Sequence, residues 1–259
     1  MVLTHLQQIR MILVQISDMK LITLGSSSTG NGYLLHNEGE ALVLEAGVSL
    51  MRVKTALDFR VNLIKGCLVS HAHKDHAKFI RSYAREGINI LAPGEVFHST
   101  HNRFYPVKPG KGYKLGNFRV IPYEVAHDTV CYSYLIDHFD CGKILFLTDS
   151  YLCEYIFPGL NHIIIEANYA DDILEENIIK GLEHPVKRER LLTTHMELKS
   201  LKAFLVAQDL SEVQSIVLIH LSDNNSHADR FLREITSLTG KQVYVAYPGL
   251  ETDLSLSPF

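Results

Sequence analysis

The chain has 259 residues, 46% of them hydrophobic, and its 25 Lys and Arg against 29 Asp and Glu give a formal net charge of −4. This composition excludes a disordered chain. The weakly acidic balance argues against a strongly cationic binder of nucleic acid or membrane surfaces. The sequence contains no apolar run of about 18 residues, the length that spans a bilayer. Histidine is the unusual residue, with 14 copies against four Cys and no Trp.

The ends and the cysteines suggest a compartment and a domain boundary. None of the four cysteines forms a C-x-x-C pair, so we expect reduced thiols and a cytoplasmic protein. The first 18 residues lack a small-residue cleavage site, which argues against a signal peptide. We expect residues 1–18 to be an N-terminal extension or upstream translated sequence, and residues 19–259 to form a single domain.

Apolar patterning predicts a strand-rich first half and a second half in which strands alternate with helices. We expect strands at 20–24, 33–35, 41–44, 66–70, 118–123, 131–137, 143–147, 162–166, 215–219 and 243–246. We expect helices at 49–59, 75–86, 173–179, 200–208 and 231–238. This order predicts an α/β domain with two sheets covered by helices.

Three histidines and one aspartate follow the strand expected at 66–70, in the segment Ser70-His71-Ala72-His73-Lys74-Asp75-His76. His71 and His73 can face the same side because alternate residues share a face. The turn into the next helix can bring Asp75 and His76 close to them. Histidine is the commonest metal ligand, so the segment predicts the start of two adjacent metal sites that need ligands from elsewhere.

Candidates for the remaining ligands stand at or just after the ends of apolar strands. His127 follows the strand expected at 118–123, Asp149 follows Ile144-Leu145-Phe146-Leu147, and His220 follows Ile216-Val217-Leu218-Ile219. A rigid sheet positions side chains well at such places. We expect these three residues to complete the two sites. The remaining histidines show no pattern and are expected on the surface: His5, His36, His98, His101, His138, His162, His184 and His227.

In order and spacing these motifs resemble those of the metallo-β-lactamase fold superfamily, over residues 19–250. The resemblance implies a four-layer αββα sandwich with the site at one edge of its two sheets. It implies two divalent metal ions, Zn²⁺ first and Mn²⁺ as the alternative. His71, His73 and His127 would hold the first ion, Asp75, His76 and His220 the second, and Asp149 would bridge them.

Within the superfamily the chain is similar to the YycJ/WalJ-like branch. Three segments carry the similarity: the GSxSxGN-like loop Gly25-Ser26-Ser27-Ser28-Thr29-Gly30-Asn31, then Glu166-Ala167-Asn168, and His220-Leu221-Ser222. We expect Ser27, Ser28, Asn31 and Asn168 to bind substrate. Many members carry Asp-x-Gly where this chain has Glu45-Ala46-Gly47, so the orientation of the metal ligands could differ slightly.

His195 precedes the helix expected at 200–208 and lies 25 residues before His220. Nuclease branches of the superfamily have a histidine in this relation to the last ligand, where it contacts the substrate phosphate. The resemblance therefore implies that His195 binds substrate and acts with Asp75 in catalysis. An exposed or helix-capping histidine is the alternative.

These residues predict a dinuclear hydrolase, for which we hold three hypotheses. The first is a phosphodiesterase that acts on nucleic acid, as an exonuclease, through a metal-bridging hydroxide. The second is a hydrolase of a small molecule such as a cyclic nucleotide, thioester or lactone. The third is a binding protein that keeps the metal site for structure, since a fold does not fix a function. Basic stretches at 108–114 and 187–190 are more typical of a solvated face than of a nucleic-acid groove.

Overall fold

The computed structural model describes residues 18–256, apart from the side chain of Lys187. Most of the expected N-terminal extension, and His5 with it, lies outside the described residues. Within the described part, no helix is long and apolar enough to cross a bilayer. All four cysteines are free thiols, and the cytoplasmic location stays a prediction. The extent of the domain, residues 19–259, also stays a prediction.

The first sheet has seven strands in the order β14-β1-β2-β3-β4-β5-β6. The strands β14, β1, β2 and β3 pair antiparallel, whereas β3, β4, β5 and β6 pair in parallel. Its strands are β1 (Lys20–Gly25), β2 (Gly32–His36), β3 (Ala41–Leu44), β4 (Ile64–Leu68), β5 (Ile90–Ala92), β6 (Phe104–Pro106) and β14 (Glu251–Asp253).

The second sheet also has seven strands, in the order β13-β12-β11-β10-β9-β8-β7. Here β13, β12, β11 and β10 are parallel, and β10, β9, β8 and β7 are antiparallel. Its strands are β7 (Tyr113–Leu115), β8 (Phe118–Val125), β9 (Cys131–His138), β10 (Gly142–Leu147), β11 (His162–Glu166), β12 (Ser215–Ile219) and β13 (Gln242–Val245).

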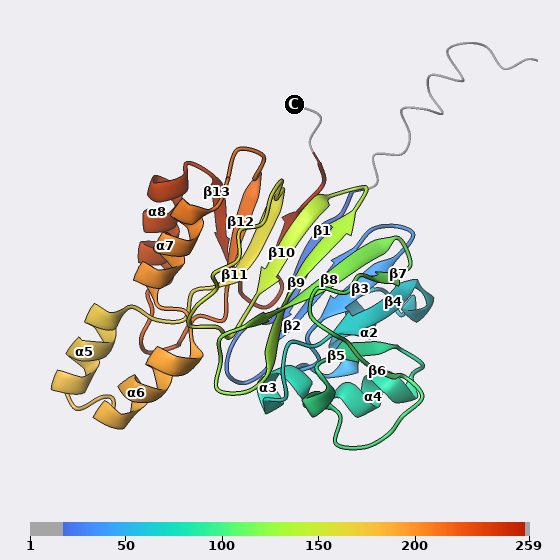
Figure 1. The fold of residues 1–259 in the computed structure, drawn as a ribbon, viewed down its shortest axis with the longest axis horizontal. Helices are drawn as coiled ribbons and strands as arrows, with labels where there is room; N and C mark the ends of the chain where they lie inside the picture. The colour runs from blue at the N-terminus through green and yellow to red at the C-terminus, as the bar shows by residue number, and fades with distance from the viewer. Residues whose placement is uncertain (1–17, 257–259) are drawn as a thin grey trace, which may run out of the picture.

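Helices cover the outer faces of both sheets (Figure 1). On the first sheet lie α2 (Leu50–Ala56), α3 (Lys74–Ala77) and α4 (Ile80–Arg85), with short 3-10 turns η1 (Val61–Leu63) and η2 (Gly94–Val96). On the second lie α7 (Leu198–Ala207) and α8 (Ala228–Thr239), while α5 (Asp171–Ile179) and α6 (Pro185–Thr194) form an arm beside it.

Three apolar clusters fill the spaces between these layers. One lies between the sheets and includes Tyr33 and Phe146, whose ring centroids are 5.8 Å apart. A second packs α2 and α4 onto the first sheet, and a third packs α7 and α8 onto the second. The predicted αββα arrangement is therefore confirmed, because two stacked sheets each bury their outer face under helices.

The structure corrects several local predictions. The helix expected at 75–86 is two short helices, and α6 and the strands β5, β6, β7 and β14 were not predicted. Strands of three residues are too short to show a period. His138 and His162, expected on the surface, are each only 1% exposed. Their surroundings explain this, because Glu40 lies 3.0 Å from Nε2 of His138 and the Ser215 hydroxyl 2.8 Å from Nδ1 of His162.

Candidate metal centre

The predicted ligands come together at one end of the sandwich, beyond the carboxyl ends of four strands. The segment from His71 to His76 leaves β4 and enters α3, whose four residues begin at Lys74. His127 follows β8, Asp149 follows β10, and His220 follows β12. Because the strands end together, residues up to 149 positions apart in sequence meet in one cluster.

The first group consists of His71, His73, His127 and Asp149, whose potential ligand atoms all lie within 4.8 Å of one another. Nε2 of His127 is 3.3 Å from Nδ1 of His73. Nε2 of His71 is 3.7 Å from Oδ2 of Asp149. The Nδ1 of His127 lies 2.8 Å from the carbonyl oxygen of Thr194. Since a carbonyl only accepts, Nδ1 carries the proton and Nε2 presents its lone pair to the cluster.

The second group consists of Asp75, His76, Asp149 and His220, again with all potential ligand atoms within 4.8 Å. Oδ2 of Asp75 is 3.2 Å from Nε2 of His76 and 3.4 Å from Nε2 of His220. Oδ2 of Asp149 lies 3.4 Å from Nε2 of His76. Asp149 is thus shared by both groups, as the resemblance implies for a bridging ligand.

Unpartnered buried nitrogens test whether this donor set suits a metal. Among the described residues, Nε2 of His71 and Nε2 of His220 are buried without a hydrogen-bond partner. Such atoms are costly unless something else satisfies them. A divalent ion does so, because it takes the lone pair of a neutral imidazole and the charge of a carboxylate. Imidazole and carboxylate suit Zn²⁺, so the residues present fit the metal that the sequence predicts.

The pKa shifts within the cluster also favour a bound cation. Burial opposes ionisation of Asp149, but His220 and His76 outweigh it and hold the pKa of Asp149 well below its usual value. Burial opposes a charged His76, but Asp149 and Glu45 raise its pKa. Burial and neighbouring His76 lower the pKa of His71. The buried carboxylates thus attract positive charge, which a divalent ion supplies when it displaces protons from the ligands.

Glu45, where many superfamily members have Asp, reaches the cluster from the end of β3. Its two carboxylate oxygens accept from the Ser70 amide at 3.2 and 3.3 Å. Oε2 lies 3.5 Å from Nδ1 of His76. The carboxylate is fully buried. The longer side chain therefore still contacts the outer nitrogen of a predicted ligand, which orients that imidazole.

Asn31, expected to bind substrate, lies beneath the ligands and is 0% exposed. Its Nδ2 lies 3.3 Å from Oδ2 of Asp75 and 3.0 Å from Nε2 of His76. Its backbone amide donates to the carbonyl of Asp75 at 2.7 Å. A Cβ at the neighbouring Gly47 would lie 1.6 Å from that same carbonyl oxygen. These contacts fit ligand orientation, and they require glycine at position 47.

Glu166 was not predicted as a site residue. It is the last residue of the buried strand β11, a position similar to those of Asp149 and His220, which follow the ends of β10 and β12. Its Oε1 lies 2.7 Å from Nδ1 of His195 and 3.0 Å from Nδ1 of His220. Its Oε2 accepts from the amides of Ser150 and Met196 at 3.2 and 3.0 Å. Glu166 also falls within a third possible ligand group, with Asp149, His195 and His220. Because both of its oxygens already accept hydrogen bonds, we assign it to orientation of the two histidines.

His195 lies at the C-terminal end of α6, beside Glu166 and within reach of the ligands. Burial opposes its protonation, but the Glu166 carboxylate outweighs burial and raises the pKa of His195. Its side chain remains 17% exposed, so it is accessible from the cleft in front of the metal ligands. A partly exposed imidazole whose protonated form is favoured in this way can donate to an anionic substrate.

The cleft in front of the ligands has a volume of about 390 Å³. Ser28, Asn168 and His195 line it, as predicted for substrate-binding residues, whereas Ser27 faces a neighbouring pocket. Nδ2 of Asn168 donates to the carbonyl of His220 at 2.9 Å. Arg190, from the unpredicted helix α6, is the one Arg or Lys among the described residues that line the cleft.

Three residues at these strand ends adopt a left-handed backbone conformation that non-glycine residues rarely take. Glu45 has φ of 69°, Asp149 of 44° and His220 of 55°. Glu45 and His220 come directly after the strands β3 and β12, and Asp149 comes one residue after β10. The left-handed turn directs all three side chains into the cluster. Strained residues of this kind concentrate at functional sites.

Comparisons with known proteins concern the fold and the sequence as a whole. No family model matches the sequence. Exodeoxyribonuclease YycJ of Bacillus anthracis is 24% identical over 239 residues, which cover 85% of this chain and 87% of the relative. Exodeoxyribonuclease WalJ of Streptococcus pneumoniae is 26% identical over 174 residues, or 60% of this chain and 64% of the relative. The metallo-β-lactamase fold protein YhfI of Bacillus subtilis superposes with a TM-score of 0.70 at 16% identity, covering 92% of this chain and 99% of its own.

Proposed function

We propose that this chain, a member of the metallo-β-lactamase fold superfamily, is a metal-dependent phosphodiesterase acting on nucleic acid. The proposal starts from its similarity in sequence to YycJ and WalJ. The proposed mode is exonucleolytic. The relatives' names say exodeoxyribonuclease, and we extend that activity to this chain as a hypothesis.

The observation that carries the proposal is the His195–Glu166 pair beside the ligand cluster. In it, a buried carboxylate lies 2.7 Å from Nδ1 of the partly exposed His195 and raises the pKa of that imidazole, which favours its protonated form. Hydrolysis at phosphorus needs positive charge near the phosphoryl oxygens and a proton for the leaving oxygen. A thioesterase or lactonase has no such need for a second cationic group.

In the proposal, His71, His73, His127 and Asp149 would hold one divalent ion, and Asp75, His76, His220 and Asp149 a second. Two such ions lower the pKa of a water molecule and stabilise the oxygens of an in-line displacement at phosphorus.

The chain's own residues have distinct roles in this proposal. Asp75, a predicted ligand that is only partly buried, would also orient the attacking water from the cleft side. His195 would donate a hydrogen bond to a phosphoryl oxygen and then a proton to the leaving oxygen. Glu166 would hold the imidazole of His195 in its donating orientation. Ser28 and Asn168 would contact the substrate from the cleft wall.

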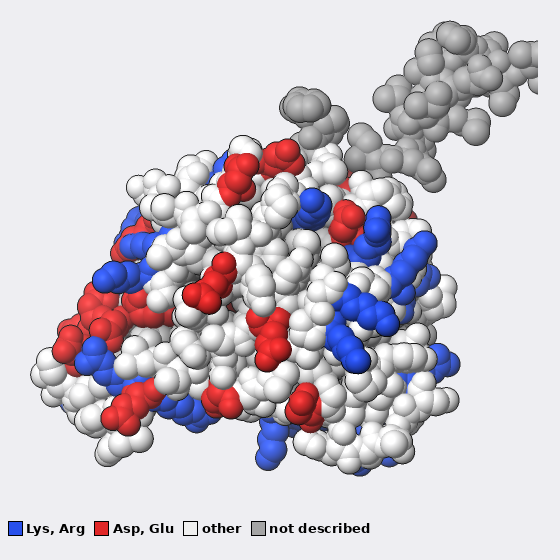
Figure 2. Space-filling model, viewed as in Figure 1, with Lys and Arg blue, Asp and Glu red and all other residues white. Residues whose placement is uncertain are grey.

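The distribution of charge favours local contacts over a wide basic groove. On the face shown in Figure 2, Lys and Arg gather at the right, over the β4 and β7 end, Asp and Glu lie in the centre, and both signs are mixed at the left. Among the described residues that line the cleft, Arg190 supplies the one guanidinium. We propose that it contacts a phosphate next to the scissile one, because guanidinium matches phosphate geometry.

A hydrolase of a small molecule, such as a cyclic nucleotide, thioester or lactone, is the second candidate. The cleft volume of about 390 Å³ favours this second candidate, because small-molecule sites have volumes in the same range. The weakly acidic charge of −4 is equally compatible with it.

One substrate panel separates the two candidates. Protein supplied with Zn²⁺ or Mn²⁺ is assayed on bis-p-nitrophenyl phosphate, end-labelled single- and double-stranded DNA and RNA, cyclic nucleotides and a thioester. We expect turnover of phosphodiesters and a loss of about 10²-fold or more in His195→Ala, the usual contribution of a general acid.

Two control variants accompany the panel. His98→Ala is the control for His195→Ala: it removes an exposed histidine outside the cleft and should leave every rate unchanged. Arg188→Gln is the control for Arg190→Gln, which should raise KM for DNA more, because Arg188 is already paired with Asp171 at 2.8 Å. Turnover of the thioester alone, unaffected by His195→Ala, would show that the proposal is wrong.

A further inference from the structure

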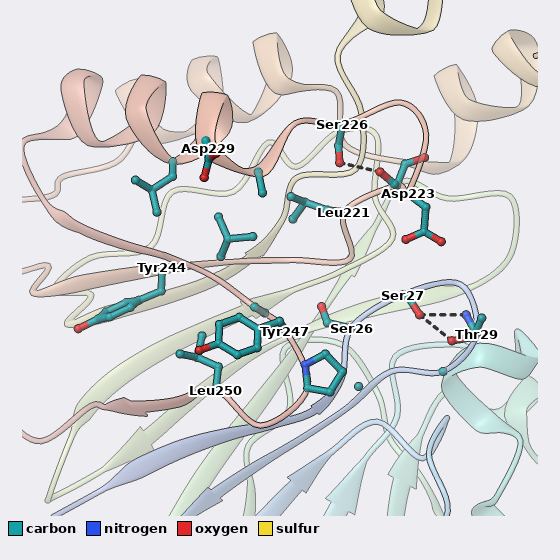
Figure 3. A pocket seen from close by; sticks show the side chains of 18 of the residues that line it. Ser26, Ser27, Thr29, Leu221, Asp223, Ser226, Asp229, Tyr244, Tyr247 and Leu250 are labelled. Carbon is teal, nitrogen blue, oxygen red and sulfur yellow. Dashed lines mark hydrogen bonds between the residues drawn. The ribbon is translucent and has the colours of Figure 1, made fainter. Parts of the chain in front are cut away.

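A second pocket of about 890 Å³ lies directly beside the metal cleft (Figure 3). Tyr247 and Leu250, from the connection between β13 and β14, form one wall. Leu221 and Asp223, from the segment after His220, form the opposite wall. The loop that carries Ser26, Ser27 and Thr29 closes the end between them. No step of the proposed hydrolysis uses this pocket.

The pocket and the metal cleft share one wall. Leu221, Ser222 and Asp223 line both of them. The hydroxyl of Ser26, on the pocket side, accepts from the backbone amide of the predicted ligand His220 at 2.8 Å. This adjacency favours, as the occupant of the pocket, a neighbouring part of a substrate that is bound at the metal centre.

The charge of the pocket disfavours phosphate as the occupant. Two carboxylates, Asp223 and Asp229, line it, and no Lys does so among the described residues. Its one guanidinium, that of Arg52, already donates from Nη1 to the carbonyl of Leu24 at 2.9 Å. Since like charges repel at short range, the pocket suits a neutral group that can donate hydrogen bonds to carboxylates.

The remaining lining matches a flat, partly apolar group. The Tyr247 side chain is 60% exposed, and Leu232 is 36% exposed, although both line the pocket. Exposed aromatic rings are the surfaces on which unpaired bases stack. Ser26 lies on the same side of the pocket as Tyr247, and Ser226 lies on the opposite side, near Leu221 and Asp223. A nucleoside has this combination of features: an aromatic base, hydroxyl groups on the sugar and, on most bases, an amino group.

We infer that this pocket binds one unpaired nucleoside of the strand whose phosphodiester is cleaved at the metal centre. The inference rests on the proposed function, which it extends by naming a substrate subsite. The base stacks on Tyr247, and Asp223 or Asp229 accepts from its amino group, in the place that a complementary strand would occupy. The enzyme therefore acts on single-stranded ends and prefers terminal nucleosides with amino groups over thymidine.

A pair of chromogenic esters isolates the contribution of the nucleoside. The 5′- and 3′-p-nitrophenyl phosphates of deoxycytidine contain the nucleoside, whereas methyl p-nitrophenyl phosphate has the same scissile bond without a nucleoside. In the native protein we expect kcat/KM to be larger for one deoxycytidine isomer than for the methyl ester. Tyr247→Ala should reduce this preference about five- to a hundredfold, the range for loss of one stacked base. Tyr247→Phe should retain it, because the ring remains.

A matched control and an activity-independent measurement complete the test. Tyr105→Ala removes a tyrosine that is 43% exposed and lines neither the pocket nor the cleft, and it should leave the preference intact. Equilibrium dialysis should show binding of 2′-deoxycytidine to the native protein, weakened by Tyr247→Ala and Asp223→Asn. Equal kcat/KM for the nucleoside and methyl esters, or a preference that survives Tyr247→Ala, would overturn the inference.

The two hypotheses fail in different ways. If none of the esters is hydrolysed with any metal, the proposed function is wrong, and dialysis alone decides on the pocket. Binding of 2′-deoxycytidine that depends on Tyr247 then still supports the subsite. Absence of such binding, with the esters hydrolysed normally, refutes the subsite and leaves the phosphodiesterase intact.

Discussion

The two ends of the sandwich both bury histidine against carboxylate, yet they differ in what the ring nitrogens contact. At the end opposite the metal centre, His138 closes β9 and Glu40 precedes β3. Nε2 of His138 lies 3.0 Å from Oε1 of Glu40, and its Nδ1 accepts from the amide of Asp140 at 3.2 Å. Asn117 donates to the other side of Glu40. Both nitrogens of this histidine are satisfied by the protein.

At the metal centre the same residue types leave ring nitrogens without partners. Nε2 of His71 faces Asp149 at 3.7 Å and Nε2 of His220 faces Asp75 at 3.4 Å, and neither has a hydrogen-bond partner in the described chain, whereas Nδ1 of each ring has one. Burial of histidine beside a carboxylate therefore does not by itself identify a metal site. Nor does a single unpartnered nitrogen, since Nε2 of His162 is also buried without a partner among the described residues. The distinguishing feature is that unpartnered nitrogens and carboxylates converge within 4.8 Å of one another.

The largest expected effect tests the shared ligand. Asp149 belongs to every possible ligand group in the described chain, so Asp149→Ala should lose bound metal and reduce phosphodiester turnover by about 10³-fold, or about 4 kcal/mol of barrier. Metal analysis by mass spectrometry and the bis-p-nitrophenyl phosphate assay measure the two effects. Glu40→Gln, at the opposite end, should keep the native metal content and rate. Full metal occupancy in Asp149→Ala would contradict the assignment.

A smaller effect concerns His162, at the end of β11 away from Glu166. Burial lowers the pKa of His162 from 6.5 to about 4. Because the unfolded chain takes up this proton near pH 6.5 and the folded protein only near pH 4, stability falls as pH drops between these values. The loss from pH 7.5 to pH 4.5 amounts to about 2–3 kcal/mol.

Urea denaturation of the native protein and of His162→Gln, at pH 7.5 and at pH 4.5, measures this contribution. The difference between the two proteins cancels the titration of the metal centre. We expect the free energy of unfolding to fall less in the variant. An identical fall in both would show that His162 titrates normally in the folded state.

Glu166→Gln tests whether Glu166 orients His195 and His220 or binds a metal ion directly. The amide keeps the shape of the side chain but removes the charge that raises the pKa of His195. Loss of a residue that orients a metal ligand costs about 10- to 100-fold in activity or metal affinity. We expect that loss in turnover, with a shift of the pH–rate profile to lower pH as His195 loses its proton more readily. A complete loss of metal, as in Asp149→Ala, would instead make Glu166 a ligand.

The smallest expected effect is structural. Glu40→Gln removes a buried carboxylate that accepts from His138 and Asn117. It should lower the free energy of unfolding by about 1–3 kcal/mol, the usual cost of an imperfectly satisfied buried group. Thermal and urea unfolding check this, with metal content as the comparison. A fall in metal content would mean that the two ends are coupled.

The sequence was informative where ligands are close together or follow apolar strands. The segment from His71 to His76 is recognisable alone, and His127, Asp149 and His220 gain meaning beside it. Apolar patterning predicted an α/β domain with two sheets covered by helices, and the resemblance to the metallo-β-lactamase fold superfamily supplied the αββα arrangement.

Features that depend on distant contacts were beyond the sequence. The polar helix α6, which brings Arg190 to the cleft, has a weak period, with Leu191 as its one buried hydrophobic residue among those described. His138 was predicted to be exposed because its partner Glu40 is 98 residues away. Glu166 carried the same strand-end signal as Asp149, but its role became visible only from its contacts with His195 and His220.

The left-handed backbone at Glu45, Asp149 and His220 has a consequence for engineering and evolution. Each such residue costs roughly 1–3 kcal/mol, which glycine would relieve. Glycine there would, however, delete a ligand or the carboxylate that orients one. Selection for thermal stability therefore meets a trade-off at these three positions. A more heat-resistant version of this protein has to find its gains elsewhere, in loops and helix surfaces that the chemistry leaves free to vary.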